Sequence, residues 1–393
     1  MRKDTLFSVA SQGLSAASNF IFTIYLVSHL SQVELGYYAL VIACAFIALA
    51  CINAIVIVPF SVQSQDKNSH SKIFLLLPCI LMSPILSIVL TTISVITSEV
   101  SFIPVFVYIC MFVLKESMKN ILFSTGSFIA GFIIDAIYVV GLFLGMLIIS
   151  DLEKVSDVLY VLIYSTAASF FVGFFFIDFY NFRLCKSENY KYIKKSSSFS
   201  LAGALAYETQ SRGANFILSA FGKHSLLGEI TAAKTIFQPL NLFVTGWSRV
   251  ARPRIANIVA IGDLSCLWKE YTKNVSLITL CTAALCLSLY ALWDMLEFYI
   301  FKGKFDNIII TSIFIAAWAY LNVVKTVTSV YVLGFNKFKE LAKVSLFAAS
   351  FTVVTLIFVS PLGLLAILIA IAINELFSLI WVLNVFKNSV HRS

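Results

Sequence analysis

Six ionisable side chains lie inside long apolar runs of this sequence, where a charge is costly to keep. They are Asp135, Glu208, Arg212, Lys234, Lys325 and Glu375. At the centre of a bilayer a charged residue costs about 2.5–3.5 kcal/mol even on the lenient insertion scale. Arginine and lysine bind phosphate, whereas carboxylates pair with cations or exchange ions. These residues are therefore candidates for an anion-binding site and for ion coupling.

A polar stripe runs through residues 198–221 at helical spacing. Its members recur every three or four residues, and they are Ser197, Ser200, Ala204, Glu208, Ser211, Arg212, Asn215 and Ser219. This spacing places them on one helix face. Comparable stripes occur in 7–28 (Gln12, Asn19), 227–250 (Lys234, Gln238) and 307–333 (Asn322, Lys325). Because unpaired polar groups are costly in hydrocarbon, these faces must meet another helix or water.

The cations of the stripes have more than one interpretation. Glu208 and Arg212 are spaced for a structural ion pair within one helix. Alternatively, Arg212 binds a phosphate and Glu208 holds it in place. Lys234 has no acidic residue one turn away, which favours a substrate role. Lys325 fits a substrate or a structural role equally well, and Asn19, Asn215 and Gln238 are candidate polar contacts to the substrate.

Two carboxylates and one basic cluster also have alternative interpretations. Asp135 and Glu375 are either ion-coupling sites or packing partners. Arg249, Arg252 and Arg254 fit the topology signal of an inner helix end or the recruitment of an anionic lipid head. Pro239 interrupts its helix below Lys234, because proline removes a backbone donor. The resulting kink could act as a hinge.

The overall composition shows how unusual charged residues are in this sequence. Of 393 residues, 60% are hydrophobic and only 12% are charged, and the mean hydropathy is +0.93. Soluble domains carry about 25% charged residues. A soluble core of this size could not hide so much apolar surface. The sequence therefore predicts an all-α integral membrane protein.

The apolar runs predict about twelve membrane helices of roughly 20 residues or more. Their ranges are 7–28, 35–60, 73–97, 101–123, 126–149, 156–181, 198–221, 227–250, 273–298, 307–333, 341–360 and 362–386. The polar interruptions of the first run argue against a cleavable signal peptide.

Alternating the sides of the membrane along these runs places most of the 28 basic residues on the side of the N-terminus. Lys115 and Lys119 are counted there, as are Arg249, Arg252 and Arg254. Such an asymmetry marks the cytoplasmic side. We therefore expect both termini to be cytoplasmic and the protein to lie in a bacterial inner membrane.

The two halves of the sequence echo each other. Asn19-Phe20-Ile21 corresponds to Asn215-Phe216-Ile217, and Gly36 corresponds to Gly228. With six helices in each half, the repeat is parallel, with a pseudo-twofold axis along the membrane normal. The expected units are 1–190 and 191–393, each a six-helix bundle.

Other chemistries find little support. The eight cysteines form no CxxC pair, and the four histidines lack metal-ligand spacing, so neither a metal nor another cofactor is expected. The formal charge of +8 is explained by membrane topology, so no nucleic acid is expected as a partner. The sequence contains no GxxxxGK[ST] phosphate-binding loop, so an ATP-driven pump is disfavoured.

The pattern resembles the polysaccharide or O-antigen flippase family of the multidrug/oligosaccharidyl-lipid/polysaccharide transporter superfamily. The resemblance rests on Ser11-Gln12-Gly13, Asn19-Phe20, Leu30, Gly36 and Tyr37-Tyr38-Ala39 in the first half. In the second half it rests on Tyr207-Glu208, Arg212-Gly213-Ala214-Asn215, Gly228, Pro239, Arg249, Pro253 and Arg254.

This resemblance implies two six-helix bundles around a V-shaped central cavity. The cargo would be an undecaprenyl-diphosphate-linked oligosaccharide, moved from the cytoplasmic to the outer leaflet. Arg212, Lys234 and Lys325 would neutralise the diphosphate, while Asp135, Glu208 or Glu375 would couple transport to cations. The polymerase and the chain-length regulator of the same pathway would be partners, besides membrane lipids.

Three alternatives remain. A flippase for a teichoic-type or peptidoglycan precursor would handle a similar head group. A multidrug or cation antiporter of the same superfamily would favour acidic and aromatic groups over the basic ones seen here. A membrane enzyme, such as a polymerase or ligase, would carry a large outer loop, and every predicted outer loop is short.

Overall fold

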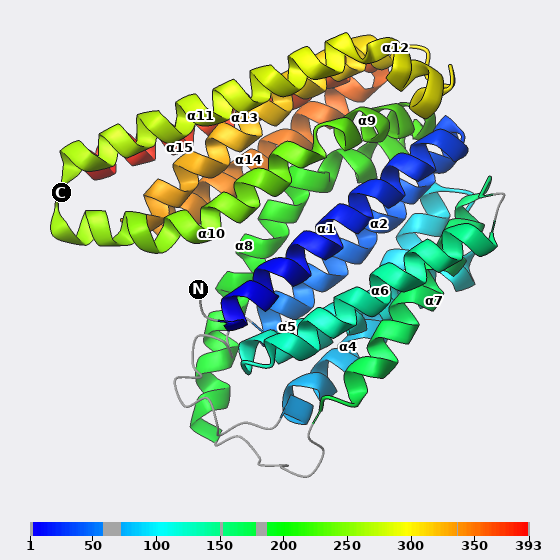
Figure 1. Cartoon of the computed structure of the whole chain (residues 1–393), viewed down its shortest axis with the longest axis horizontal. Coiled ribbons are helices and arrows are strands. Elements are labelled where there is room, and N and C mark those ends of the chain that lie inside the picture. The colour runs from blue at the N-terminus through cyan, green and yellow to red at the C-terminus, as the bar shows by residue number, and fades with distance from the viewer. Residues whose placement is uncertain (1–2, 58–71, 150–151, 178–186, 336, 392–393) are drawn as a thin grey trace. The chain divides into compact units, whose positions relative to one another are not determined.

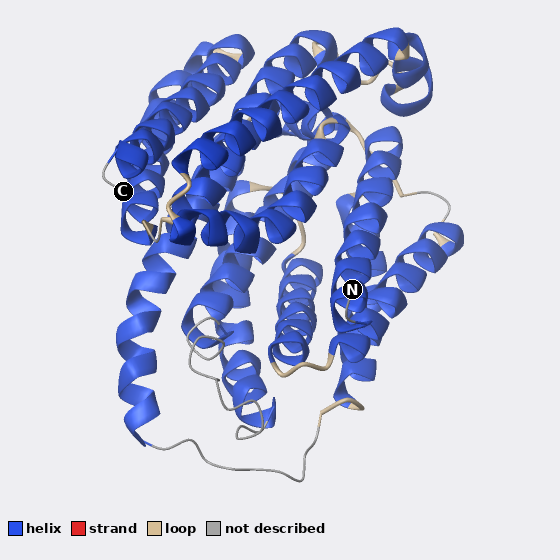
Figure 2. Ribbon diagram, turned by 60° about the vertical axis from the view of Figure 1, so that its left-hand side comes forward, coloured by secondary structure: helices blue, strands red, loops and turns tan. Residues whose placement is uncertain are grey.

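The computed structural model describes residues 3–57, 72–149, 152–177, 187–335 and 337–391. Every regular element in these ranges is a helix, and none of them contains a strand (Figure 2). The predicted all-α class is therefore confirmed.

The helices divide into two compact units. Unit 1 comprises Met1–Glu208 and Gly222–His224, and unit 2 comprises Thr209–Phe221 and Ser225–Ser393. The division falls inside the long helix α8 (Ser187–Ala220), which contributes to both units. The boundary predicted between residues 190 and 191 lies earlier in the same helix, and it stays a prediction about the sequence repeat.

In unit 1, helix α5 packs against four neighbours. The helices are α1 (Lys3–His29), α2 (Gln32–Ile52), α4 (Lys72–Thr97), α5 (Phe102–Ser124), α6 (Phe128–Ile148) and α7 (Val155–Phe174). A π-helical turn, Asn53–Ile57, continues α2. Helix α5 contacts α2, α4, α6 and α7, and α1 lies along α6 (Figure 1).

In unit 2, helix α13 packs against α10, α11 and α15. The helices after α8 are α9 (His224–Ile236), α10 (Gln238–Ile261), α11 (Leu264–Ala291), α12 (Trp293–Leu296), α13 (Ile308–Gly334), α14 (Phe338–Val359) and α15 (Leu364–His391). A π-helical turn, Glu297–Phe301, follows α12, and a 3-10 turn, Ser360–Leu362, separates α14 from α15.

These helices overlap the predicted runs, two of which are divided. The run 273–298 holds the end of α11 and all of α12. The run 227–250 is two helices, α9 and α10, which meet at Phe237. Pro239 lies at the start of α10, where a missing backbone N–H is tolerated. The interruption expected near Pro239 is therefore present. Residues 58–60 and 178–181 of the predicted runs lie outside the described residues.

Eight helical stretches among the described residues are long and apolar enough to cross a membrane. Helices α1, α5 and α8 are not among them, because polar stripes or charges interrupt their apolar runs. Their polar residues need protein neighbours or water. The least apolar helices are therefore where a functional site is to be sought.

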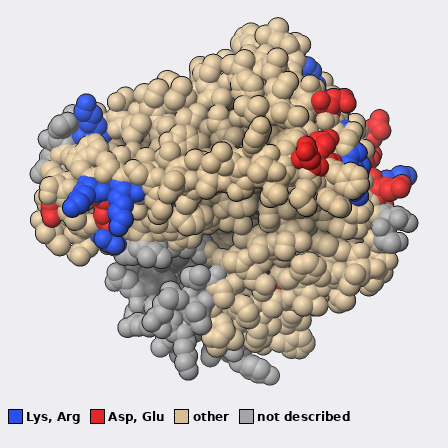
Figure 3. All heavy atoms as spheres, turned by 45° about the horizontal axis from the view of Figure 1, so that its top comes forward, with Lys and Arg blue, Asp and Glu red and all other residues tan. Residues whose placement is uncertain are grey.

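The exposed charges of unit 2 are divided between its two ends. Arg252, Arg254 and Lys269 are exposed where α10 meets α11, whereas Asp294 and Asp306 are exposed near α12. Figure 3 shows Lys and Arg gathered toward one side of this face, and Asp and Glu mixed with further Lys and Arg toward the other. Lys302 is also exposed near α12. The side of the membrane on which either end lies stays a prediction.

Candidate functional site

An ion pair joins two packed helices inside unit 2. Lys325 Nζ on α13 contacts the Glu375 carboxylate on α15. The side chains are only 16% and 6% exposed, respectively. Burial makes such a pair dependent on both partners, because removal of either one leaves an uncompensated charge.

Lys234 extends this pair into a cluster of charges. Its Nζ lies 4.9 Å from the centre of the Trp318 ring, a cation–π contact between α9 and α13. Arg212 of α8 and Glu375 are close enough to act electrostatically on the same ammonium group. Glu375 thus lies between Lys325, which it contacts, and Lys234, on which it acts electrostatically.

Polar side chains close the space around this cluster. A cavity of about 20 Å³ is lined by Gln210, Ser211, Ala214, Lys234, Trp318, Thr352, Ile371, Asn374 and Glu375. That volume holds about one water molecule. Gln210 donates to Ser378 Oγ at 3.0 Å, and Asn374 donates to Thr355 Oγ1 at 2.9 Å. The cluster is thus packed, and a diphosphate does not fit without rearrangement.

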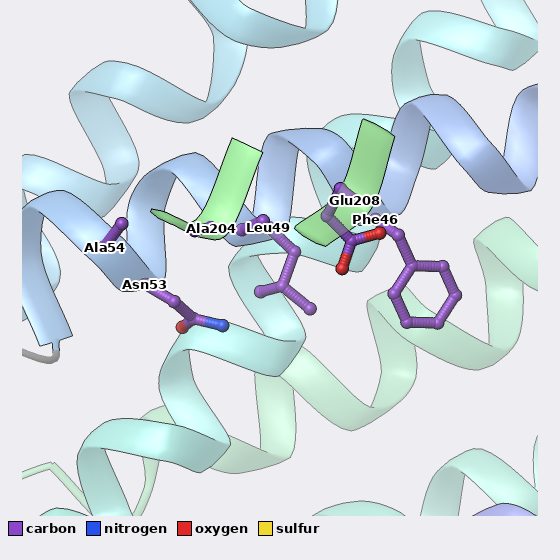
Figure 4. A pocket seen from close by; sticks show the side chains of 7 residues that line it. Phe46, Leu49, Asn53, Ala54, Ala204 and Glu208 are labelled. Atoms are coloured by element: carbon purple, nitrogen blue, oxygen red, sulfur yellow. The ribbon is translucent and has the colours of Figure 1, made fainter. Parts of the chain in front are cut away.

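Unit 1 contains a larger recess beside α2. It has a volume of about 300 Å³ and is lined by Phe46, Leu49, Ala50, Asn53, Ala54, Ala204 and Glu208. Figure 4 shows the Glu208 carboxylate turned toward Phe46 and Leu49. Asn53 accepts a hydrogen bond from Asn120 at 3.1 Å, which fixes the amide at the edge of the recess.

A second charge cluster is buried between α5 and α6. Lys115 and Lys119 lie 3.4 Å and 3.2 Å from Asp135 Oδ1. Both lysines also contact Glu116, at 2.6 Å and 2.8 Å. Lys115 and Asp135 are 1% and 0% exposed. The cluster is balanced, with two cations and two carboxylates.

Helix α1 is attached to this cluster. The Ser11 hydroxyl donates to Asp135, and the Tyr138 hydroxyl donates to Asn19 Oδ1 at 3.1 Å. Lys115 Nζ lies 4.1 Å from the centre of the Tyr138 ring. The polar stripe of α1 therefore has a structural partner in α6.

The structure gives two of the predicted topology residues partners and adds residues that the sequence did not single out. Lys115 and Lys119 are buried in ion pairs with Asp135, and the side of the membrane on which they lie stays a prediction. Trp318, Asn374 and Glu116 belong to the clusters and were missed. The only feature of the sequence that could have pointed to these three residues is their position on helix faces rich in polar residues.

The remaining candidates are distributed as follows. Asn19 and Asp135 belong to unit 1, whereas Asn215 and Gln238 lie in unit 2, both partly buried. Glu208 and Arg212 fall on opposite sides of the division in α8, and their pairing stays a prediction.

The basic cluster of α10 is exposed rather than part of either charge cluster. Arg252 is exposed, and Arg254 pairs with Glu270 at 2.6 Å. The side chain of Arg249 lies outside the described residues. No group of three or more metal-ligating side chains occurs in the described ranges.

Comparison with known proteins identifies the fold. No protein-family profile matches the sequence, and no curated protein matches it. Solved structures do match. A multidrug resistance MATE family transporter of the MOP superfamily, in an inward-facing conformation, has a TM-score of 0.72 at 13% identity, covering 100% of this chain and 95% of that one. The fold is that of the MATE transporters.

Two further structures agree with this result. An outward-facing MATE transporter gives a TM-score of 0.61 at 15% identity, covering 99% of this chain and 95% of that one. A MOP superfamily transporter from Pyrococcus furiosus Vc1 (DSM3638) gives 0.60 at 14% identity, covering 99% and 94%. That protein is described as having a binding pocket of reverse polarity, which suggests a different function. The likeness shows a shared fold, and membership of the superfamily and of its flippase branch stays a prediction.

Proposed function

We propose that this chain is a membrane transporter whose unit 2 binds the anionic head of an amphiphilic substrate. The observation that carries this proposal is the buried Lys325–Glu375 ion pair with Lys234 beside it, which Arg212 also approaches. Keeping these charges inside membrane helices is expensive, and intramembrane ionisable residues mark substrate or ion paths. Lys234 and Lys325 together offer two ammonium groups to an anion.

The substrate that fits best is an undecaprenyl-diphosphate-linked oligosaccharide, such as an O-antigen unit. Arg212, Lys234 and Lys325 would bind the diphosphate. Asn19, Asn215 and Gln238 would contact the glycan, while the prenyl chain stays in lipid. In a bacterial inner membrane, an inside-negative potential favours outward movement of anions by about 2.3 kcal/mol per charge per 100 mV.

The MATE-like fold supports transport but does not select the charge of the cargo. The Pyrococcus furiosus structure, with its described reverse polarity, indicates that this fold accommodates pockets of different charge. The partners would be the lipid-linked substrate, the surrounding lipids, and the polymerase and chain-length regulator of the pathway. Cation coupling through Asp135, Glu208 or Glu375 would supply further drive.

A complementation experiment tests this function. The gene is deleted in its host, and surface polysaccharide and inner-leaflet lipid-linked oligosaccharide are measured. We expect loss of surface polymer and accumulation of the lipid-linked unit, rescued by wild type and by Lys343→Ala but not by Lys234→Ala. Lys343 is a suitable control because its side chain is exposed and pairs with Glu340 on the same helix. Unchanged surface polymer in the deletion strain would refute the flippase proposal.

A multidrug exporter is the second candidate. The comparisons favour it, because the matching structures include multidrug transporters. The recess of unit 1 also favours it, because Glu208 and Phe46 offer a carboxylate and an aromatic face, which suit a cation. Efflux of ethidium from cells that produce the protein tests this candidate. Transport that Glu208→Gln abolishes and Lys234→Ala leaves intact would establish the exporter instead of the flippase.

A further inference from the structure

We propose that Glu375 is a built-in counter-ion that occupies the place of the substrate's anionic group and must be displaced before the substrate binds. This inference rests on the proposed function and concerns how the same site is regulated. It makes Glu375 a residue that sets affinity and release rather than one that merely packs α13 against α15.

The position of the carboxylate is the first observation. Glu375 contacts Lys325 directly and acts electrostatically on Lys234, which Arg212 also approaches. The two lysines come from α9 and α13, so the carboxylate lies where groups from separate helices converge. An incoming phosphate would gain most from the same point, because it would meet both ammonium groups.

The volume of the cavity is the second observation. The space bounded by Lys234, Trp318, Asn374 and Glu375 is only about 20 Å³, enough for one water molecule. A phosphate group is larger than this space. Substrate and the Lys325–Glu375 pair therefore exclude each other, and binding requires the pair to open.

The energetic consequence follows from burial. Lys325 is only 16% exposed, so an empty site without Glu375 would hold a buried and uncompensated ammonium group. The carboxylate stabilises the empty state and competes with the bound one. An anion with a single weak charge gains little from replacing it, whereas a diphosphate brings more charge and more acceptor oxygens. The counter-ion thereby favours strongly anionic substrates and speeds their release.

The test uses the full-length purified protein in nanodiscs and radiolabelled farnesyl diphosphate as the probe. We expect Glu375→Gln to bind the probe at least about tenfold more tightly than wild type, because the amide no longer competes for Lys325. The double variant Glu375→Gln/Lys325→Met should lose this gain. Glu229→Gln is the matched control, since Glu229 is also buried in unit 2 but pairs with the Thr311 hydroxyl at 2.7 Å.

Thermal unfolding establishes that each variant is folded. If Glu375→Gln does not fold, Glu375→Asp replaces it, because its shorter carboxylate weakens the pair and should also tighten binding. If a folded Glu375 variant binds the probe no more tightly than wild type, and wild type still binds it, the proposed counter-ion role of Glu375 is overturned. The transport proposal would then still stand. Failure of wild type and of every folded variant to bind would refute both.

Discussion

Lys119 Nζ lies 3.2 Å from Asp135 Oδ1, and this contact joins α5 to α6 in the interior of unit 1. Asp135 also contacts Lys115 and accepts a hydrogen bond from Ser11 of α1. One carboxylate thus connects three helices, two of which carry too many polar residues to lie in lipid alone.

Asp135→Asn should destabilise unit 1 strongly. The substitution leaves two buried lysines with only Glu116 as a partner, and breaking a buried ion pair costs about 3–5 kcal/mol. Thermal unfolding in detergent measures the loss. Glu340→Gln is the control, since its pair with Lys343 is exposed and worth less than about 1 kcal/mol. Equal effects of the two substitutions would contradict a structural role for the Asp135 cluster.

Trp318→Ala should weaken substrate binding, whereas Trp318→Phe should retain part of it. The indole face positions Lys234, and a cation–π contact contributes about 0.5–2 kcal/mol. The expected loss is therefore roughly 2- to 30-fold in apparent affinity. Binding of radiolabelled farnesyl diphosphate to the protein in nanodiscs provides the readout. Unaltered affinity of the alanine variant would show that Trp318 does not position Lys234.

Gly36→Ala should destabilise the protein by about 1–3 kcal/mol or more. A Cβ at this position would lie 2.1 Å from the backbone oxygen of His224, and a backbone atom cannot move aside as a side chain does. Gly246→Ala is the matched control, because its Cβ meets nothing within 4 Å and alanine favours a helix. We expect that control to be neutral or stabilising. A fully stable Gly36→Ala protein would show that α2 does not approach His224 so closely.

Acidification should destabilise the contact between His224 and Tyr37. The centres of their rings lie 4.6 Å apart. His224 precedes the predicted membrane run 227–250. Burial lowers the pKa of its imidazole below the ordinary value of 6.5. Protonation therefore favours the unfolded state, and the stability contributed by neutral His224 is lost as the pH falls below about 6.5.

Unfolding temperatures measured between pH 8 and pH 5 test this prediction. The decrease in wild type should be smaller in His224→Gln, which cannot take up a proton. Identical decreases in both proteins would assign the pH dependence to other groups.

The amino-acid sequence determined the all-helical class, the approximate ends of the membrane helices and the faces that avoid lipid. These properties are local, because about 20 apolar residues satisfy one span and helical spacing sets which side chains share a face. The break beside Pro239 was visible for the same reason, since proline acts on its own helix.

Tertiary structure decided which polar residues meet. Lys115 and Lys119 follow the usual pattern of a basic helix end, yet their partner Asp135 lies on the next helix. Glu375 and Lys325 are likewise fifty residues apart in sequence number and in contact across α13 and α15. A polar stripe in the sequence indicates only that this helix face must pack against another group or water. The packing of helices distant in sequence determines whether that neighbour is a counter-ion, an aromatic ring or an open recess.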